Sequence, residues 1–257
     1  MRSTISITIV KAPTVLVLLG ICRVALGTIT TVILPTETQP SGAPASVGQA
    51  GDFVFTVINS HTAAVSTLHQ VGAGSPTATR GDNPANTIAP GDTITFAVPT
   101  GWFGRLAMYE KDFDVVDRAT LLEGSFFMNS GHAIMAMDVS YVDAFTVPVV
   151  CECDDQVQLG CNLNLQEICP EYLQLNGKTC ANPYRDDPQH PPGPENIFQD
   201  CRGMAYTYPT DDTATKVDLP GCSRSTTCCI GTACRPHPGQ LKCPVKDGYA
   251  EECAKAP

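Results

Sequence analysis

Short apolar runs with the composition of β-strands recur along residues 51–150. Six of them are rich in β-branched and aromatic residues: Phe53–Ile58, Thr93–Val98, Arg105–Tyr109, Thr120–Phe127, Met137–Val142 and Phe145–Val150. Turn-forming residues separate them, as in Gly81-Asp82-Asn83-Pro84 and Pro90-Gly91-Asp92. Regularly spaced short strands of this kind predict a mainly β protein, a sandwich or a flattened barrel.

Residues 151–257 have a different character, because they combine many cysteines with little apolar periodicity. Two short helices are expected, near Leu163–Leu173 and Glu195–Met204. The stretch between them, Asn182–Pro194, contains five prolines and is expected to be irregular. We therefore expect a disulfide-rich loop region that completes one domain with the cysteine-free sandwich half, 51–150.

The beginning of the chain predicts export. Residues 1–27 have the features of a signal peptide: Arg2 supplies positive charge, an apolar run covers Thr14–Gly20, and small residues precede a cleavage site near Gly27. An uncleaved anchor is the alternative, but the run is shorter than the about 20 residues that span a bilayer. Residues 28–50, rich in Pro, Ser, Thr and Gly, predict a flexible leader.

The charge of the mature chain narrows the choice of partners. Removing residues 1–27 deletes Arg2, Lys11 and Arg23 and no acid, so the formal net charge moves from −10 to −13. Such a surface disfavours nucleic acid and anionic membranes. A neutral polymer, a cation or a basic partner is compatible with it. No cofactor motif is present, so no cofactor is expected.

The cysteines agree with an oxidising compartment. Thirteen are encoded, and Cys22 leaves with the signal peptide. The other twelve predict up to six disulfides of open pairing: Cys151, Cys153, Cys161, Cys169, Cys180, Cys201, Cys222, Cys228, Cys229, Cys234, Cys243 and Cys253. A zinc site is the alternative, but His190 and His237 do not fall into a ligand spacing, so no metal is expected.

Carboxylates in strand-like runs are the candidates for chemistry. Glu123 interrupts TLLEGSFF, and Asp138 and Asp143 interrupt AMDVSYVDAF. Each can simply face solvent from the open side of a sheet, since burying a lone charge is costly. Five residues of strand span roughly 16 Å and an odd separation points to opposite faces, so Asp138 and Asp143 share a site only if the chain bends between them. The tripeptide Arg80-Gly81-Asp82 matches an integrin-binding sequence, but Gly81-Asp82-Asn83-Pro84 is an ordinary turn, so adhesion is not expected.

Several segments resemble the signatures of thaumatin-like proteins, in the order of that family. These are MDVSYVDAFTVPV at 137–149, TLLEGSF at 120–126, CRGMAYTYPTDD at 201–212, CPEYLQL at 169–175, Gly104-Arg105 and, more weakly, FVFTVINSHTAA at 53–64. The resemblance covers about Phe53–Pro220 and implies a β-sandwich beside a disulfide-rich region. The sandwich half lacks the family's cysteines, and Cys228-Cys229 follows the CRGMAYTYP segment instead of preceding it, so disulfide pairing cannot be transferred.

The resemblance also implies an acidic cleft that faces a β-1,3-glucan. Its family residues correspond to Arg105, Glu123, Asp138, Asp143 and Asp211, with Asp212 as an adjacent alternative to Asp211. Aromatic platforms for sugar rings are expected from Trp102, Phe103 and Tyr208 beside it, although Trp102 fits a core position equally well.

Three interpretations of function remain open. The first is a secreted protein that binds cell-wall β-1,3-glucan with weak or no hydrolysis. The second is an endo-β-1,3-glucanase with Glu123 as general acid, Asp138 as base or nucleophile, Arg105 orienting a carboxylate, and Asp143 and Asp211 binding sugar hydroxyls. The third is an antifungal, defence-type or cell-wall surface protein without catalysis.

Overall fold

A computed structural model describes residues 51–81, 86–187, 197–245 and 253, all within one compact unit, Ala45–Pro257. The expected signal peptide, the leader, Asp82, His190 and the beginning of the helix predicted from Glu195 lie outside the described residues. Among the residues that are described, no helix has both the length and the apolar character needed to span a membrane.

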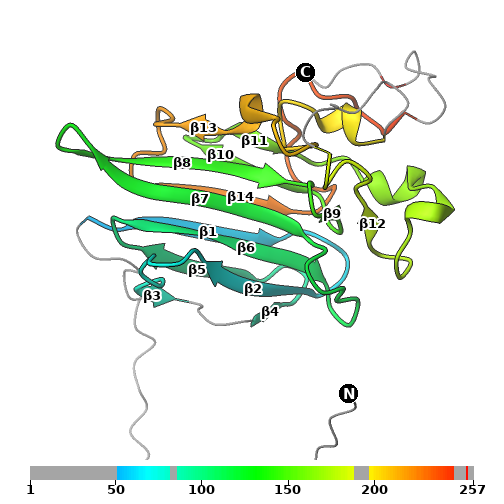
Figure 1. Ribbon diagram of the computed structural model, residues 1–257, viewed down its shortest axis with the longest axis horizontal. Coiled ribbons are helices and arrows are strands. Elements are labelled where there is room, and N and C mark those ends of the chain that lie inside the picture. Colours follow the sequence, from blue (N-terminus) through cyan, green and yellow to red (C-terminus); the bar gives the residue numbers. More distant parts are fainter. Residues whose placement is uncertain (1–50, 82–85, 188–196, 246–252, 254–257) are drawn as a thin grey trace, which may run out of the picture. The chain divides into compact units, whose positions relative to one another are not determined.

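Two six-stranded sheets form the body of the protein (Figure 1). The first contains, in spatial order, β11 (Gln156–Cys161), β10 (Val149–Cys153), β14 (Ser225–Ile230), β1 (Phe53–Asn59), β5 (Thr93–Val98) and β3 (Arg80–Gly81). The second contains β13 (Lys216–Val217), β8 (His132–Ser140), β7 (Thr120–Asn129), β6 (Trp102–Glu110), β2 (Val65–Val71) and β4 (Asn86–Ile88). A separate pair joins β9 (Ala144–Phe145) to β12 (Cys180–Ala181). The prediction of a mainly β protein is confirmed.

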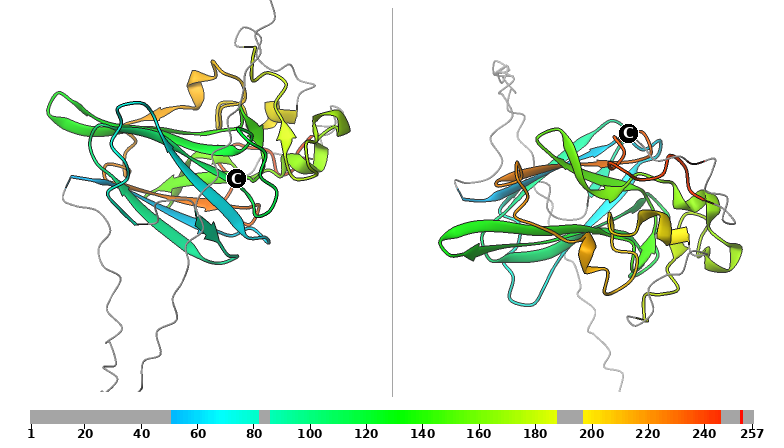
Figure 2. Two further views of the ribbon diagram at one scale, coloured as in Figure 1. Left: turned by 60° about the horizontal axis from the view of Figure 1, so that its bottom comes forward. Right: turned by 90° about the horizontal axis from the view of Figure 1, so that it is seen from above.

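The core lies between the two sheets, which face each other as layers when the molecule is viewed from above (Figure 2). Strand β1 alternates buried and partly exposed residues, with Phe53, Phe55 and Val57 turned inward. The Phe53 ring lies 5.6 Å from the ring of Phe126 in the opposite sheet. The Phe55 ring stacks 4.8 Å from that of Phe96 in the neighbouring strand. Period-two alternation of large apolar side chains therefore joins the layers.

The interpretation of 151–257 as loops and short helices omitted its strands. Strands β11 and β14 and most of β10 come from this region and complete the first sheet. Their sequences were missed because Thr, Gln and Cys replace the aliphatic residues that mark the other strands. The helices that do occur in the described residues are single 3-10 turns: η1 (Leu165–Ile168), η2 (Glu171–Leu173), η3 (Ile197–Cys201) and η4 (Asp212–Ala214).

All twelve cysteines from Cys151 onward are paired, as the even count predicted. The bridges are Cys151–Cys228, Cys153–Cys222, Cys161–Cys201, Cys169–Cys180, Cys229–Cys234 and Cys243–Cys253. The first connects directly opposite residues of β10 and β14. Adjacent Cys228 and Cys229 point to opposite faces of β14, so they form bridges to different partners.

Strand β14 occupies an interior position of the first sheet. It runs parallel to β1, with Val54 opposite Ser225 and Asn59 opposite Ile230. Its other edge is antiparallel to β10. Within the described residues, the last strand is thus inserted beside the first.

A contact at Glu110 attaches the disulfide-rich region to the second sheet. Glu110 ends β6 and is only 7 % exposed. Its Oε1 atom lies 3.0 Å from Nε2 of His61, in the turn before β2, and 2.9 Å from Nζ of Lys178. Lys178 belongs to the loop that the Cys169–Cys180 bridge closes. We call this three-residue cluster the Glu110 contact.

Candidate functional site

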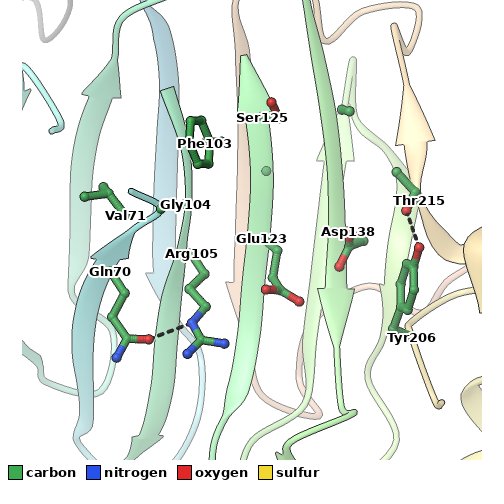
Figure 3. Close-up of a pocket in the computed structure, with 13 residues that line it drawn as sticks. Gln70, Val71, Phe103, Gly104, Arg105, Glu123, Ser125, Asp138, Tyr206 and Thr215 are labelled. Atoms are coloured by element: carbon green, nitrogen blue, oxygen red, sulfur yellow. Dashed lines mark hydrogen bonds between the residues drawn. The ribbon is translucent and has the colours of Figure 1, made fainter. Parts of the chain in front are cut away.

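Four polar residues form one row across the second sheet. The strand register places Gln70 of β2 opposite Arg105 of β6, Arg105 opposite Glu123 of β7, and Glu123 opposite Asp138 of β8. Residues in register on neighbouring strands share a face and lie about 4.5–5.5 Å apart at Cβ. The sheet therefore assembles a cation and two carboxyl groups in one line, which we call the polar row (Figure 3).

The polar row forms the floor of an open groove of about 1000 Å³ on the face of the sheet turned away from the core. Its lining consists of Gln70, Val71, Gly72, Phe103, Gly104, Arg105, Glu123, Gly124, Ser125, Ala136, Asp138, Tyr206 and Thr215. The two last residues come from the disulfide-rich region, so this region supplies one wall of the groove.

The sheet beneath the polar row lies close to a buried indole. Trp102 is 3 % exposed and packs in the core, 5.9 Å from the Phe55 ring. A Cβ atom on Gly104 would stand 3.1 Å from this indole and 2.6 Å from the carbonyl oxygen of Gln70. Glycine at 104 thus lets the β6 backbone lie close to β2 and to the indole of its own strand. Of the two roles considered for Trp102, the structure gives it the core.

Burial, and after it the charge of a nearby carboxylate, raises the pKa of both carboxyl groups. Burial, and after it the neighbouring Glu123, raises the pKa of Asp138 to about 8, although a hydrogen bond with Thr215 opposes the shift. Burial also raises the pKa of Glu123. There the nearby charge of Arg105 acts against the increase.

The cation therefore distinguishes the two carboxyl groups. Arg105 faces Glu123 directly, and Asp138 lies one strand farther away. An adjacent cation favours an ionised carboxylate. Glu123 thus has an adjacent cation that favours its ionised form, whereas the raised pKa of Asp138 favours its protonated form at neutral pH.

Asp143 lies just beyond the end of β8, where the chain bends toward Arg105. Its Oδ2 atom is 3.4 Å from Nη1 of Arg105, and its Oδ1 atom is 2.9 Å from Nε of Arg185. It lines a small neighbouring hollow of about 40 Å³ and does not line the main groove. With both oxygens in ion pairs, Asp143 is placed to orient Arg105, which also donates from Nε to Gln70 at 2.6 Å.

Asp211 does not line the groove. It is 1 % exposed and accepts hydrogen bonds from the Thr207 hydroxyl at 2.9 Å and the Thr213 hydroxyl at 3.1 Å. These bonds stabilise the turn between η3 and η4. Its neighbour Asp212 is exposed and accepts a hydrogen bond from the Tyr206 hydroxyl at 3.0 Å. Of the two adjacent aspartates, Asp212 is thus the one connected to the groove.

Two aromatic rings line the groove. Phe103, one of the expected platforms, is 41 % exposed and lies over Gly72. Tyr206 was not predicted and stands beside Asp138 at the opposite end of the row (Figure 3). The other expected platform, Tyr208, is buried 5.2 Å from the Arg202 guanidinium and is not part of the lining.

Gln70, Ser125, Tyr206 and Thr215 are the polar groove residues that sequence reasoning missed. Gln70 lies in β2, VSTLHQV, which was not predicted as a strand because its sequence is too polar. Tyr206 and Thr215 reach the groove because the backbone of Tyr206 pairs with the end of β8 and Lys216 pairs with Met137. Neither pairing has a signal in the local sequence. The described residues include no group of three or more His, Cys, Asp or Glu side chains arranged to hold a metal ion.

Comparisons with known proteins give a single type of match. No protein-family model matches the chain. No curated protein matches it either. Among matching solved structures is the protein elicitor MoHrip2 from Magnaporthe oryzae, at 13% sequence identity and a TM-score of 0.36, in an alignment that covers 69% of this chain and 98% of that chain.

Proposed function

We propose that this is a secreted carbohydrate-binding protein whose groove holds a β-1,3-glucan or a related cell-wall polysaccharide. The observation that carries the proposal is the polar row along the groove floor. Amide, guanidinium and carboxyl groups in sequence offer donors and acceptors to a chain of sugar hydroxyls. Six disulfides are typical of proteins that fold outside the reducing cytosol.

Aromatic rings beside the row support the same ligand class. Phe103, two residues along β6 from Arg105, offers an exposed ring, and the partly exposed Tyr206 lines the groove beside Asp138, so a sugar chain bound in the groove can contact both rings. Aromatic faces combined with a few convergent polar groups are typical of carbohydrate sites. The resemblance to thaumatin-like proteins in the sequence around Glu123 and Asp138 points to glucan in particular.

The test is co-sedimentation of the oxidised, mature protein with insoluble β-1,3-glucan, beside cellulose and chitin. We expect retention on the β-1,3-glucan and a reduction of about threefold to tenfold in affinity for Phe103→Ala. Glu171→Gln is the matched control, because Glu171 is exposed in η2 and does not line the groove. Equal retention of Phe103→Ala and the control would contradict a binding role for this groove.

A second candidate function, hydrolysis, is favoured by the Glu123–Asp138 pair. Two carboxyl groups with different tendencies to ionise are what a glycosidase requires. Asp138 would protonate the glycosidic oxygen as the bond to the sugar breaks, and Glu123 would attack the anomeric carbon. Water then releases the sugar, with Asp138 recovering its proton. Because the two residues are in direct register, their short separation favours retention of configuration.

Reducing-sugar release from soluble β-1,3-glucan tests this candidate. Release by the native protein that disappears in both Glu123→Gln and Asp138→Asn would establish hydrolysis. Release of inverted sugar, followed by NMR, would refute Glu123 as nucleophile. No release from folded native protein would eliminate hydrolysis and leave the binding function intact.

A further inference from the structure

The ring of Phe103 rests on the backbone of a glycine at the β2 side of the groove. A Cβ atom on Gly72, the residue after β2, would overlap ring atoms Cδ2 and Cε2 of Phe103 and stand 3.2 Å from Cζ. The ring thus occupies the space that a side chain at position 72 would fill. In this position it is 41 % exposed and lines the groove.

The main chain at position 72 does not itself require glycine. Gly72 is not among the described glycines with a positive φ, whereas Gly74, two residues later, has a φ of +87°. Alanine can therefore adopt the backbone conformation of position 72. The three heavy atoms nearest to an added Cβ all belong to the Phe103 side chain. Glycine at this position accommodates the ring and not the backbone.

Hydrogen bonds fix the Phe103 backbone against the turn that follows β2. The Gly72 amide donates to the Phe103 carbonyl at 3.1 Å, and the Phe103 amide donates to the Ser75 hydroxyl at 2.9 Å. The Ser75 amide donates in turn to the Gly72 carbonyl at 3.0 Å. With its backbone held at both polar groups, Phe103 can move its ring only by rotation of side-chain bonds. The ring position therefore depends on what stands at position 72.

Small side chains lie on the other side of Phe103, toward β7 and β8. Ser125 is opposite Phe103 in the strand register, and Ala136 is opposite Ser125 (Figure 3). Alternate residues of a strand share a face, so these three residues form a second row beside the polar row. Ser125 and Ala136 line the groove. While the ring lies over Gly72, the space above Ser125 is open to a ligand, and a ring displaced from Gly72 moves into that space.

We propose that Gly72 is a positioning residue: it lets the Phe103 ring lie at the β2 side of the groove, as a platform for a sugar ring that enters the space above Ser125. This subsite belongs to the same groove, so the proposal rests on the proposed function. An aromatic ring contributes to sugar binding through a face that the ligand can reach. A displaced ring would fill the subsite instead of forming its wall, so Phe103 and Gly72 act as a pair.

The first measurement uses the ligand-free protein. NMR should show nuclear Overhauser contacts between the α-protons of Gly72 and the ring protons of Phe103. In Gly72→Ala we expect new contacts between the ring and the β-protons of Ser125. The urea midpoint of this variant should not fall, because alanine fits the backbone and reduces the entropy of the unfolded chain. A lower midpoint would overturn the proposal, since glycine would then serve the fold and not the ring.

Co-sedimentation of the oxidised, mature protein with insoluble β-1,3-glucan measures the consequence for binding. Gly72→Ala should weaken retention about threefold to tenfold, as expected for Phe103→Ala. The matched control is Gly72→Ala in the Phe103→Ala background, where the added methyl group has no ring to displace. This double variant should bind no more weakly than Phe103→Ala alone.

The outcomes separate this proposal from the proposed function. Gly72→Ala that binds like the native protein, or two losses that simply add in the double variant, would overturn the role of Gly72 and leave the groove as a glucan site. Absence of contacts between Gly72 and the Phe103 ring in the free protein would do the same. If the native protein itself is not retained, the proposed function fails, and the sugar platform fails with it.

Discussion

The Glu110 contact predicts how acid destabilises the protein. Glu110→Gln keeps the size and one acceptor oxygen of the side chain but removes its charge. His61 and Lys178 both approach the same oxygen at 3.0 and 2.9 Å. Hydrogen bonds to a charged group contribute about 1.5–3 kcal/mol each. Because the Lys178 side chain is 43 % exposed, solvent reduces its share. We expect Glu110→Gln to lower the free energy of unfolding by about 1–2 kcal/mol.

The effect of Glu110→Gln on the free energy of unfolding should depend on pH. Burial tends to raise the pKa of Glu110, but the hydrogen bonds from His61 and Lys178 outweigh burial and lower it below its ordinary value of 4.5. A carboxyl group whose pKa falls on folding stabilises the native state above its unfolded pKa. That contribution disappears as the pH falls through the folded value. The difference between native protein and Glu110→Gln should therefore be full well above pH 4.5 and shrink as the pH falls below 4.5 and through the folded pKa.

Urea denaturation with the disulfides intact measures this difference. Trp102 is the single tryptophan of the chain and is buried in the core, so its fluorescence reports unfolding. A loss of about 1–2 kcal/mol corresponds to roughly 3–6 °C in melting temperature for a domain of this size. Glu171→Gln, an exposed glutamate in the same region, is the control. A difference that does not shrink at any acidic pH at which the native protein stays folded would refute the ionic explanation.

Three further predictions concern the polar row. Gly104→Ala should lower the free energy of unfolding by about 1–2 kcal/mol, because the added Cβ meets Trp102 and a backbone carbonyl. An unchanged urea midpoint would contradict this close packing. Arg105→Gln should raise the pKa of Glu123, because the cation that favours its ionised form is lost; carboxyl NMR measures it, and a fall would contradict the assignment. Asp138→Asn should stabilise the protein at pH 8 and have little effect at pH 4. The folded pKa of Asp138 is about 8 and its ordinary pKa is 3.8, so the native carboxyl group costs stability as the pH rises between these values. Equal urea midpoints for the native protein and Asp138→Asn at pH 8 would show that the Asp138 carboxyl ionises freely.

Local pattern was sufficient for the aliphatic and aromatic strands. Thr93–Val98 was predicted as a strand and forms β5 with those bounds. The turn at Pro90-Gly91-Asp92 is present, with Gly91 at a φ of +84°. Strand β14, Ser225–Ile230, could not be recognised, because its burial comes from disulfides and from two neighbouring strands instead of from aliphatic side chains.

The site was predictable in its residue types and not in its electrostatics. Arg105, Glu123 and Asp138 were selected by resemblance, and the strand register brings them into one row. The expectation that Asp143 needs a bend to join them agrees with its place after β8. Which of the two carboxyl groups more readily keeps a proton depends on which of them lies opposite Arg105. That register is set by tertiary packing between distant strands, and so is the position of Tyr206 beside the groove. Neither could be predicted from local sequence.

The position of β14 has a consequence for how the protein must be made. A strand that ends at Ile230 separates β1 from β10, so the first sheet cannot close until most of the chain has been synthesised. Until then β1 exposes an unpaired edge, the kind of surface on which chains aggregate. Contacts this distant in sequence also slow folding. The Cys151–Cys228 and Cys153–Cys222 bridges connect β10 to β14 and to the segment just before it. Disulfides that form before β14 is inserted beside β1 would therefore trap an open sheet. Production in a host with a disulfide-exchange system is therefore a requirement of the topology itself.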